Sequence, residues 1–357
     1  MTADLSTNEF MTFSDPSRAP GAAAPRNEPV FHQYGRVAIA DAPGVTDPAP
    51  PSPYNAAEMS ATELMGAHAF RRRSANNSRA AGKKRNFEGL SWQGAADGGP
   101  APIHPPGEAL TRFDTPAPPQ WAAPEELPPL SARMTGRIAV GLVIVSGTAA
   151  HLRFTTDEQL LVVSEVQNGL SFLANEAPQK DVTFVHDISV LSVSAAEAPP
   201  DARDFDAFEA PWRDGALAQL GHRPGLAGAD AYARALRDRH GTDWAYIAFF
   251  TKYRLWHFAY ASLGGPRLVM HFDNDGWGPE QIDRVFAHET GHIFHAPDEY
   301  AQSGCDCGGA WGHFGEPNRN CANCAPGGSQ KCIMQSNDWA MCDATRRHLG
   351  YSGLSEI

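Results

Sequence analysis

Hydrophobic and polar positions follow regular patterns from about residue 131 onward. The apolar run Ile138 to Val145 predicts a strand that is buried on both faces. Thr156 to Asn175 has apolar residues at helical spacing and two acidic residues, Asp157 and Glu158, in its first turn, which together predict a helix. Alternating apolar residues from Val182 to Val193 predict a second strand.

The pattern continues toward the C-terminus. Ala229 to His240 is predicted to be a helix that Gly241 ends. Trp244 to Phe250 predicts a strong strand, and His257 to Ala261 predicts a weaker one. A last strand is predicted for Arg267, Leu268, Val269, Met270, His271 and Phe272. This order of elements predicts an α/β (α+β) fold, in which helices pack on a mixed sheet.

A motif with metal-binding spacing follows the last predicted strand. Its opening is H-E-x-x-H, at the end of an amphipathic segment that predicts a helix. Residues four apart lie one turn apart on the same helix face, so His288 and His292 can bind one ion. Glu289 is rotated about a quarter turn away, too far to be a natural ligand. It is placed to hold a water at that ion and take its proton.

The third ligand is a choice among three residues. Pro297 disfavours helical geometry in the residue before it, so the helix is predicted to end near His295. The turn that follows brings the carboxylate of Asp298 just beyond the break. Asp298 is therefore the first candidate, with His295 as the alternative and Glu299 as a weaker one. A catalytic zinc ion takes three protein ligands and keeps one open position, so one such ion is predicted.

Residues 1–130 differ in composition from the rest of the chain. This stretch contains 19 of the 29 prolines and many Ala and Gly residues, with little apolar periodicity. It is predicted to be a largely disordered extension, whose basic clusters at 71–73 and 83–85 suit a solvated tail. The alternative is an inhibitory prosegment laid over the active site, without a blocking thiol because no cysteine precedes Cys305. Residues 131–357 are predicted to form the catalytic domain.

Charge and hydropathy exclude some partners. The net charge of −12 argues against nucleic acid and anionic membranes as main partners. The longest apolar run is too short to span a bilayer, which predicts a soluble protein. The first thirteen residues lack the basic start and apolar core of an ordinary secretory signal. An extracellular and a cytoplasmic location both stay open, as does the oligomeric state.

All six cysteines lie in one glycine-rich stretch after the H-E-x-x-H motif. Three disulfides would hold together a region too small for a core of its own. The alternative is a second, structural zinc ion bound by four thiolates, such as those of the Cys-x-Cys and Cys-x₂-Cys pairs. Disulfides are favoured, and their connectivity stays open. The six residues are Cys305, Cys307, Cys321, Cys324, Cys332 and Cys342.

One acidic turn raises the question of calcium. Asp273-Asn274-Asp275-Gly276 alternates acidic residues ahead of a glycine, as calcium loops do. No full twelve-residue loop follows, and no glutamate closes it. A polar turn is therefore favoured over a calcium site.

The stretch His288 to Asp298 resembles the extended zinc motif of the metzincin metallopeptidases. It matches the variant with an aspartate as third ligand, as in the snapalysin and bacterial IgA-peptidase types. Cys332-Ile333-Met334 resembles the methionine turn that lies beneath the zinc in this family, with Met334 as the methionine. The resemblance covers roughly residues 131–357.

The resemblance implies an architecture and a mode of substrate binding. It implies an upper subdomain, residues 131–294, with a twisted sheet and two long helices. A loop-rich, cysteine-rich lower subdomain, residues 295–357, would contain the methionine turn. It also implies that a peptide lies antiparallel along an edge strand, expected here at Arg267 to Phe272.

Two residues depart from the family pattern. His295 stands where the family usually has glycine, so the turn there is expected to differ in shape. Some members place a tyrosine two residues after the methionine, where it supports the transition state, and here that residue is Ser336. Tyr300 is a candidate for this role, with packing as the alternative.

The function that these features predict is zinc-dependent endopeptidase activity on a protein or peptide substrate, with Glu289 as general base. One alternative is a non-catalytic binding or adhesion module that keeps zinc for stability. The intact Glu289 separates the two, because a module without chemistry has no need of that carboxylate. A narrower alternative is a zinc hydrolase that acts on a non-peptide amide or ester.

Overall fold

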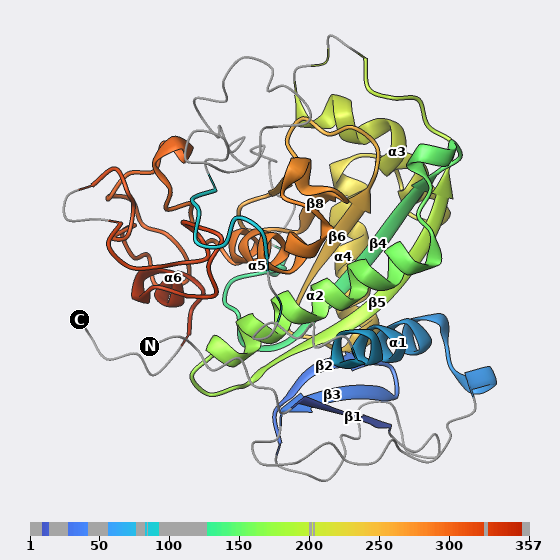
Figure 1. Ribbon diagram of the computed structural model, residues 1–357, viewed down its shortest axis with the longest axis horizontal. Coiled ribbons are helices and arrows are strands. Elements are labelled where there is room, and N and C mark those ends of the chain that lie inside the picture. Colours follow the sequence, from blue (N-terminus) through green and yellow to red (C-terminus); the bar gives the residue numbers. More distant parts are fainter. Residues whose placement is uncertain are drawn as a thin grey trace.

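A mixed β-sheet runs through the centre of the molecule (Figure 1). The computed structural model describes residues 9–13, 28–41, 56–75, 83, 85–92, 127–199, 202, 204–324 and 328–351. Within these residues the sheet has eight strands in the order β1-β3-β2-β5-β4-β6-β8-β7. Their bounds are β1 (Glu9–Phe13), β2 (Val30–Tyr34), β3 (Val37–Asp41), β4 (Gly136–Gly147), β5 (Val182–Val193), β6 (Trp244–Thr251), β7 (Ala259–Ala261) and β8 (Arg267–His271).

The middle of the sheet is parallel. β4 pairs in parallel with both β5 and β6, and β6 pairs in parallel with β8. Along β4, Ile138 and Val140 belong to the core on one face, and Ala139 and Val143 belong to the core on the other. Both faces of the strand are covered, which explains its continuous apolar run. The mixed α/β fold and the buried strand predicted from the sequence are therefore confirmed.

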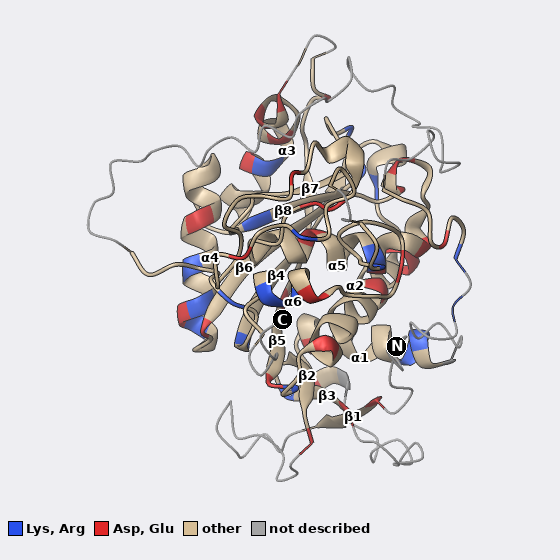
Figure 2. Cartoon of the chain, turned by 90° about the vertical axis from the view of Figure 1, so that its left-hand side faces the viewer, with Lys and Arg blue, Asp and Glu red and all other residues tan. Residues whose placement is uncertain are grey.

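Helices cover both faces of the sheet. On one face lie α1 (Ala61–Ala75), α2 (Thr156–Glu176) and α5 (Ile282–Ile293), and on the other lie α3 (Phe205–Gln219) and α4 (Leu226–His240). Acidic and basic residues both occur along α4 (Figure 2). The sequence patterns predicted α2 and α4 within three residues of these bounds but missed α3, whose interior holds Pro211. None of the described helices is long and apolar enough to cross a membrane.

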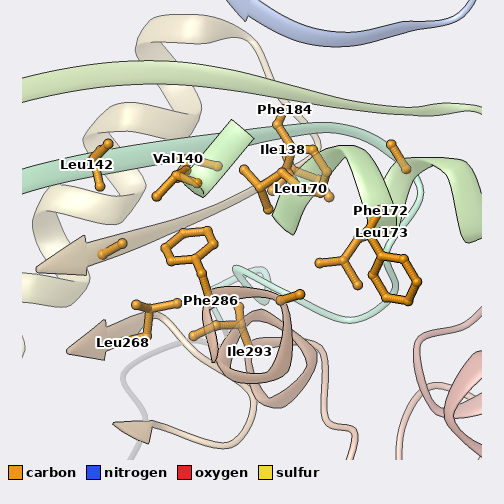
Figure 3. Packing of buried hydrophobic residues seen from close by; sticks show 14 of the residues in the cluster. Ile138, Val140, Leu142, Leu170, Phe172, Leu173, Phe184, Leu268, Phe286 and Ile293 are labelled. Carbon is orange, nitrogen blue, oxygen red and sulfur yellow. The ribbon is translucent and has the colours of Figure 1, made fainter. Parts of the chain in front are cut away.

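The first core lies on the face of the sheet that carries α1, α2 and α5, and in it α5 packs against both α2 and the sheet. Leu170 of α2 and Phe286 and Ile293 of α5 belong to the same buried cluster as the inner residues of β4 (Figure 3). The two helices approach closely at Gly169, where an added Cβ would lie 2.4 Å from the carbonyl oxygen of Asp283. This packing fixes the position of α5, and with it the positions of the side chains on its other face.

The N-terminal region contributes to the same sheet. β2 pairs in parallel with β5, β3 and β1 extend the sheet beyond it, and α1 packs on α2. Phe31, Tyr34, Val37 and Ile39 are almost fully buried in the first core. The prediction of a largely disordered extension is therefore wrong for these segments. They are short, and their apolar residues become buried only against partners distant in sequence.

Two buried histidines link β2 to the rest of the sheet. Nδ1 of His32 on β2 lies 3.0 Å from Nε2 of His186 on β5, and Nε2 of His32 lies 2.9 Å from Oγ of Ser171 on α2. Burial lowers the pKa of His186 to about 3 and holds the pKa of His32 well below its usual range. Both rings are therefore neutral in the folded chain at neutral pH.

We expect acid to destabilise the native state through these histidines. Because the folded pKa of His186 of about 3 lies below its unfolded value near 6.5, the unfolded chain binds more protons as the pH falls through that interval. The free energy of unfolding should then fall by about 2 kcal/mol between pH 7.5 and pH 5 through His186 alone. Urea unfolding of wild type and His186→Gln at both pH values measures this loss. An equal loss in the two proteins would contradict the prediction.

The chain after α5 has little regular structure. It contains a short 3₁₀ turn, Ala301–Ser303, and one short helix, α6 (Asp343–His348). This part (orange to red in Figure 1) lies to one side of α5. The expected loop-rich character of the C-terminal region is observed in its described residues.

Candidate metal centre

Helix α5 presents two imidazoles on one face. The Nε2 atoms of His288 and His292 lie 3.1 Å apart. Nδ1 of His288 lies 2.9 Å from the carbonyl oxygen of Ile333, and Nδ1 of His292 lies 2.7 Å from that of Ala296. A carbonyl oxygen only accepts hydrogen bonds, so each Nδ1 carries the proton. Each Nε2 is then available as an electron-pair donor.

The turn after α5 adds a carboxylate to the imidazole pair. The helix ends at Ile293, and His295 takes a left-handed conformation with φ of 68°, which reverses the chain before Pro297. Oδ1 of Asp298 then lies 3.1 Å from Nε2 of His288 and 3.3 Å from Nε2 of His292. The three side chains predicted as ligands therefore meet at one point.

These three atoms have the spacing of metal ligands. Ligand atoms that bind a tetrahedral zinc ion at about 2.0–2.1 Å are about 3.3–3.4 Å from one another. The observed separations of 3.1, 3.1 and 3.3 Å are close to that value. The described residues hold one other group of three ligand types, Glu299 with Cys332 and Cys342. The set of two imidazoles and a carboxylate fits a divalent cation with an open fourth position.

A proton competes with a cation at this point. Burial lowers the pKa of His292, but the carboxylate of Asp298 outweighs it and raises that pKa to about 9. The two imidazoles in turn hold the pKa of Asp298 well below its usual range, against the effect of burial. A metal ion must displace the proton from His292, so the affinity of the site for metal should rise with pH up to about 9.

Glu289 lies beside the three converging side chains without belonging to them. It is buried, and its Oε2 atom makes no hydrogen bond. Burial raises its pKa, although His292 and His288 act in the opposite direction. A buried carboxylate oxygen without a partner is uncommon, and here it belongs to a residue that lines the cleft that contains His288 and His292. Glu289 is therefore equipped to accept a proton in this cleft.

Met334 packs against α5 at the residue between the two histidines. An added Cβ on Gly291, which stands between the two histidines in α5, would lie 2.7 Å from Sδ of Met334. The backbone N–H of Glu299 donates to the carbonyl oxygen of Met334 at 3.0 Å. The predicted methionine turn is thus in contact with both the helix and the segment that follows Asp298.

The other candidate ligands face elsewhere. Nε2 of His295 lies 3.2 Å from the carbonyl oxygen of Ser131. The carboxylate of Glu299 is buried and accepts hydrogen bonds from Thr345 and Asn320, both at 2.8 Å. The structure therefore groups Asp298 with the two histidines and places His295 and Glu299 outside this group.

A cleft of about 220 Å³ opens over the metal-ligand group. Its walls come from three distant parts of the chain: the β7 region, the cysteine-rich loops and a segment near residue 90. Several aromatic side chains and Glu289 belong to this lining. The lining residues with an aromatic ring, counting the two ligand-group histidines and His257, are Trp92, His257, Phe258, Tyr260, His288, His292, Tyr300 and Trp311.

The edge of the sheet at this cleft is β7, which corrects the prediction. β8, with residues Arg267 to His271, lies between β6 and β7, so it has strand neighbours on both sides. β7 pairs antiparallel with β8 on one side, and Ala259, Tyr260 and Ala261 line the cleft. The sequence predicted both strands, but it does not show which of two neighbouring strands lies outside.

Tyr300 and His257 both line the cleft, but only Tyr300 was a functional candidate from the sequence. Tyr300, a candidate for transition-state support, is buried in the cleft wall. Burial and the carboxylates of Asp298 and Glu289 raise its pKa well above 10.0. His257 also lines the cleft, with Nδ1 2.6 Å from the carbonyl oxygen of Ala259. As a lone histidine it carried no signal in the sequence.

Four of the six cysteines form disulfides. Disulfides join Cys305 to Cys321 and Cys307 to Cys324, with Cα–Cα distances of 5.8 and 5.9 Å. Cys332 and Cys342 are free and buried. The disulfide prediction is therefore confirmed for two pairs. The four-thiolate zinc alternative would require the same four cysteines that form these bonds.

We expect two of the six cysteines to be free thiols. In denaturant without a reductant, iodoacetamide should label Cys332 and Cys342 and leave the other four cysteines unmodified. Peptide mass spectrometry measures this, and a reduced sample, in which all six should react, is the control. Labelling of all six without reductant would contradict the disulfides and favour metal-bound or free thiolates.

The acidic turn after β8 does not gather metal ligands. Asn274 and Asp275 adopt left-handed conformations with φ of 48° and 47°. Nδ2 of Asn274 donates to the carbonyl oxygen of Gly278 at 3.1 Å. Among the described residues, the groups of three possible metal ligands include neither Asp273 nor Asp275.

Comparisons with solved structures give distant likenesses, two of which are to metallopeptidases. No family model and no curated protein matches the sequence. Metalloproteinase-II from Bacteroides fragilis is 12% identical, over 66% of this chain and 58% of its own, with a TM-score of 0.29. This chain therefore spans less than two thirds of that protein. Archaemetzincin from Archaeoglobus fulgidus, complexed with malonate, is 12% identical over 59% of this chain and 99% of its own, with a TM-score of 0.22. TM-scores this low carry no argument about function.

Proposed function

We propose that this protein is a zinc-dependent endopeptidase of metzincin-like type. One observation carries the proposal. Two imidazole Nε2 atoms and a carboxylate oxygen converge at metal-ligand spacing beside the buried carboxylate of Glu289, whose Oε2 atom has no hydrogen-bond partner. A buried polar group without a partner costs stability. A zinc site that served stability alone would have no use for it.

The ligand group determines what Glu289 does. His288, His292 and Asp298 would hold zinc, which when bound polarises a scissile carbonyl and makes a water more acidic. Glu289 accepts a proton as that water adds to the carbonyl carbon, and its raised pKa brings its basicity closer to neutral pH. It then delivers this proton to the amine nitrogen as the carbon–nitrogen bond breaks. Water is added across the peptide bond, and Glu289 returns to its starting state.

The edge of β7 that is free within the described part of the chain supports a protein or peptide as the substrate. β7 borders the cleft and has a strand partner only on the β8 side within the described residues. An extended peptide can add to such an edge through backbone hydrogen bonds, which hold any sequence in one orientation. This arrangement supports a protein or peptide substrate over a small non-peptide amide or ester.

The proposal is tested with the full-length chain. We expect one zinc ion per chain by elemental analysis, and internal cuts in a mixed peptide library read by mass spectrometry. A chelator such as 1,10-phenanthroline should abolish the cuts, and added zinc should restore them. A protein that binds zinc at this site and cuts no peptide under these conditions would overturn the peptidase function.

A further inference from the structure

Residues 85–92 lie against the chain that contains the methionine turn. The backbone N–H of Asn337 donates to the carbonyl oxygen of Leu90 at 2.8 Å, and the N–H of Gly89 donates to that of Asn337 at 2.9 Å. Ser91 and Ser336 form an antiparallel bridge. This N-terminal segment (cyan in Figure 1) therefore runs beside α5 and pairs with the residues that follow Met334.

Buried ion pairs attach the segment to the helix layer. Arg85 pairs with Asp283 in α5, and both side chains are at most 1% exposed. Lys83 pairs with Glu165 in α2. Breaking a buried pair leaves an uncompensated charge, which is strongly unfavourable. The basic cluster at 83–85, expected to be part of a solvated tail, thus supplies two anchors that hold the segment in place.

Trp92, at the end of this segment, contacts His288 in two ways. Its ring meets the His288 ring at 68°, with centroids 5.6 Å apart. Its Nε1–H donates at 2.7 Å to the carbonyl oxygen of Ile333, the same oxygen that accepts from Nδ1 of His288. The carbonyl that orients this imidazole is therefore itself held by Trp92.

Trp92 also forms part of the cleft wall. It lines the same cavity as Glu289 and the β7 residues. On its other side it packs edge-on against Trp277, with centroids 5.2 Å apart, which limits the movement of its ring. A rigid aromatic surface beside the reacting groups favours substrates with an apolar side chain at that position.

We propose that Trp92 is a positioning residue for His288 and a specificity-determining wall of the cleft. Residues 85–92 are then part of the active site. The part that concerns substrates rests on the proposed peptidase function, and the part that concerns metal does not. An outer-shell partner that orients a metal-binding histidine contributes about 10- to 100-fold to metal affinity. Trp92 acts one contact further out, so we expect a smaller effect.

Two substitutions separate the two roles in the full-length chain. Trp92→Phe keeps a ring but loses the N–H donor, so we expect zinc affinity to fall by about 3- to 10-fold with little change in KM. The visible spectrum of the cobalt-substituted protein should also shift. Trp92→Ala should weaken zinc equally or more and, in addition, raise KM for peptides with an apolar residue at the contacted position.

Trp311→Phe is the matched control. Trp311 lines the same cleft, but its Nε1–H donates to the carbonyl oxygen of Gly308 and not to that of Ile333. We expect this change to leave the zinc affinity and the cobalt spectrum as in wild type. Chelator competition measures affinity, and circular dichroism shows that each variant is folded.

The outcomes separate the inference from the proposed function. Wild-type zinc affinity and cobalt spectrum in both Trp92 variants would overturn the positioning role. An equal loss of affinity in Trp311→Phe would show a general effect of the cleft wall and overturn it as well. A wild-type protein that binds zinc but cuts no peptide would overturn the peptidase function, while the metal measurements would still decide the role of Trp92.

Discussion

Glu289→Gln is expected to lower kcat for peptide hydrolysis by about 10²- to 10⁴-fold, the usual contribution of a general base. Glutamine has nearly the same shape but cannot take a proton from water. Oε2 of Glu289 makes no hydrogen bond and is not among the three converging ligand atoms. The substitution should therefore leave zinc content and fold unchanged, so that the loss appears in kcat. Steady-state kinetics with elemental analysis of the same samples measures both quantities.

The control for this prediction is the same change at an exposed site. The side chain of Glu197 is 49% exposed and faces His151 at 3.9 Å, outside the cleft lining. Glu197→Gln should keep wild-type kcat, KM and zinc content. Glu289→Ala should behave like Glu289→Gln. Near-normal turnover in either zinc-loaded Glu289 variant would remove this residue from the proposed mechanism.

Asp298→Ala is expected to weaken zinc binding by more than about 100-fold, because loss of a direct ligand should exceed the effect of losing an outer-shell partner. The change removes one of three donor atoms and the only negative charge among them. It also removes the carboxylate that does most to raise the pKa of His292, so that pKa would fall. Residual zinc binding should then be less dependent on pH between 7 and 9 than in wild type. Chelator competition across this pH range measures both effects.

His295→Asn is the matched control for the ligand assignment. His295 has a positive φ of 68°, and asparagine tolerates this conformation better than alanine does. Because the His295 ring is directed to the carbonyl oxygen of Ser131, zinc affinity should stay close to wild type. Retention of zinc in Asp298→Ala together with its loss in His295→Asn would reverse the assignment.

Local sequence determined the central elements of this protein. The strands β4, β5 and β6 and the helices α2 and α4 were predicted within three residues of their observed bounds, because periodic apolar residues specify which face is buried. Residues four apart lie on the same face of any helix, so the sequence alone places His288 and His292 on one face of α5. Pro297 acts on the residue before it, so the end of the helix and the arrival of Asp298 are also encoded locally.

The tertiary structure decided the features that depend on contacts between segments distant in sequence. The short strands β1 to β3 carry too few apolar residues to be recognised alone, and they become buried by pairing with one another and with β5 and by packing against α1 and α2. The places of β7 and β8 at the sheet edge, and the pairing of four cysteines, depend on how separate segments pack. Trp92 stands in a stretch without periodicity, and only folding brings it to His288. A local pattern shows that a residue is apolar or able to bind metal, but packing determines which residue lies beside it.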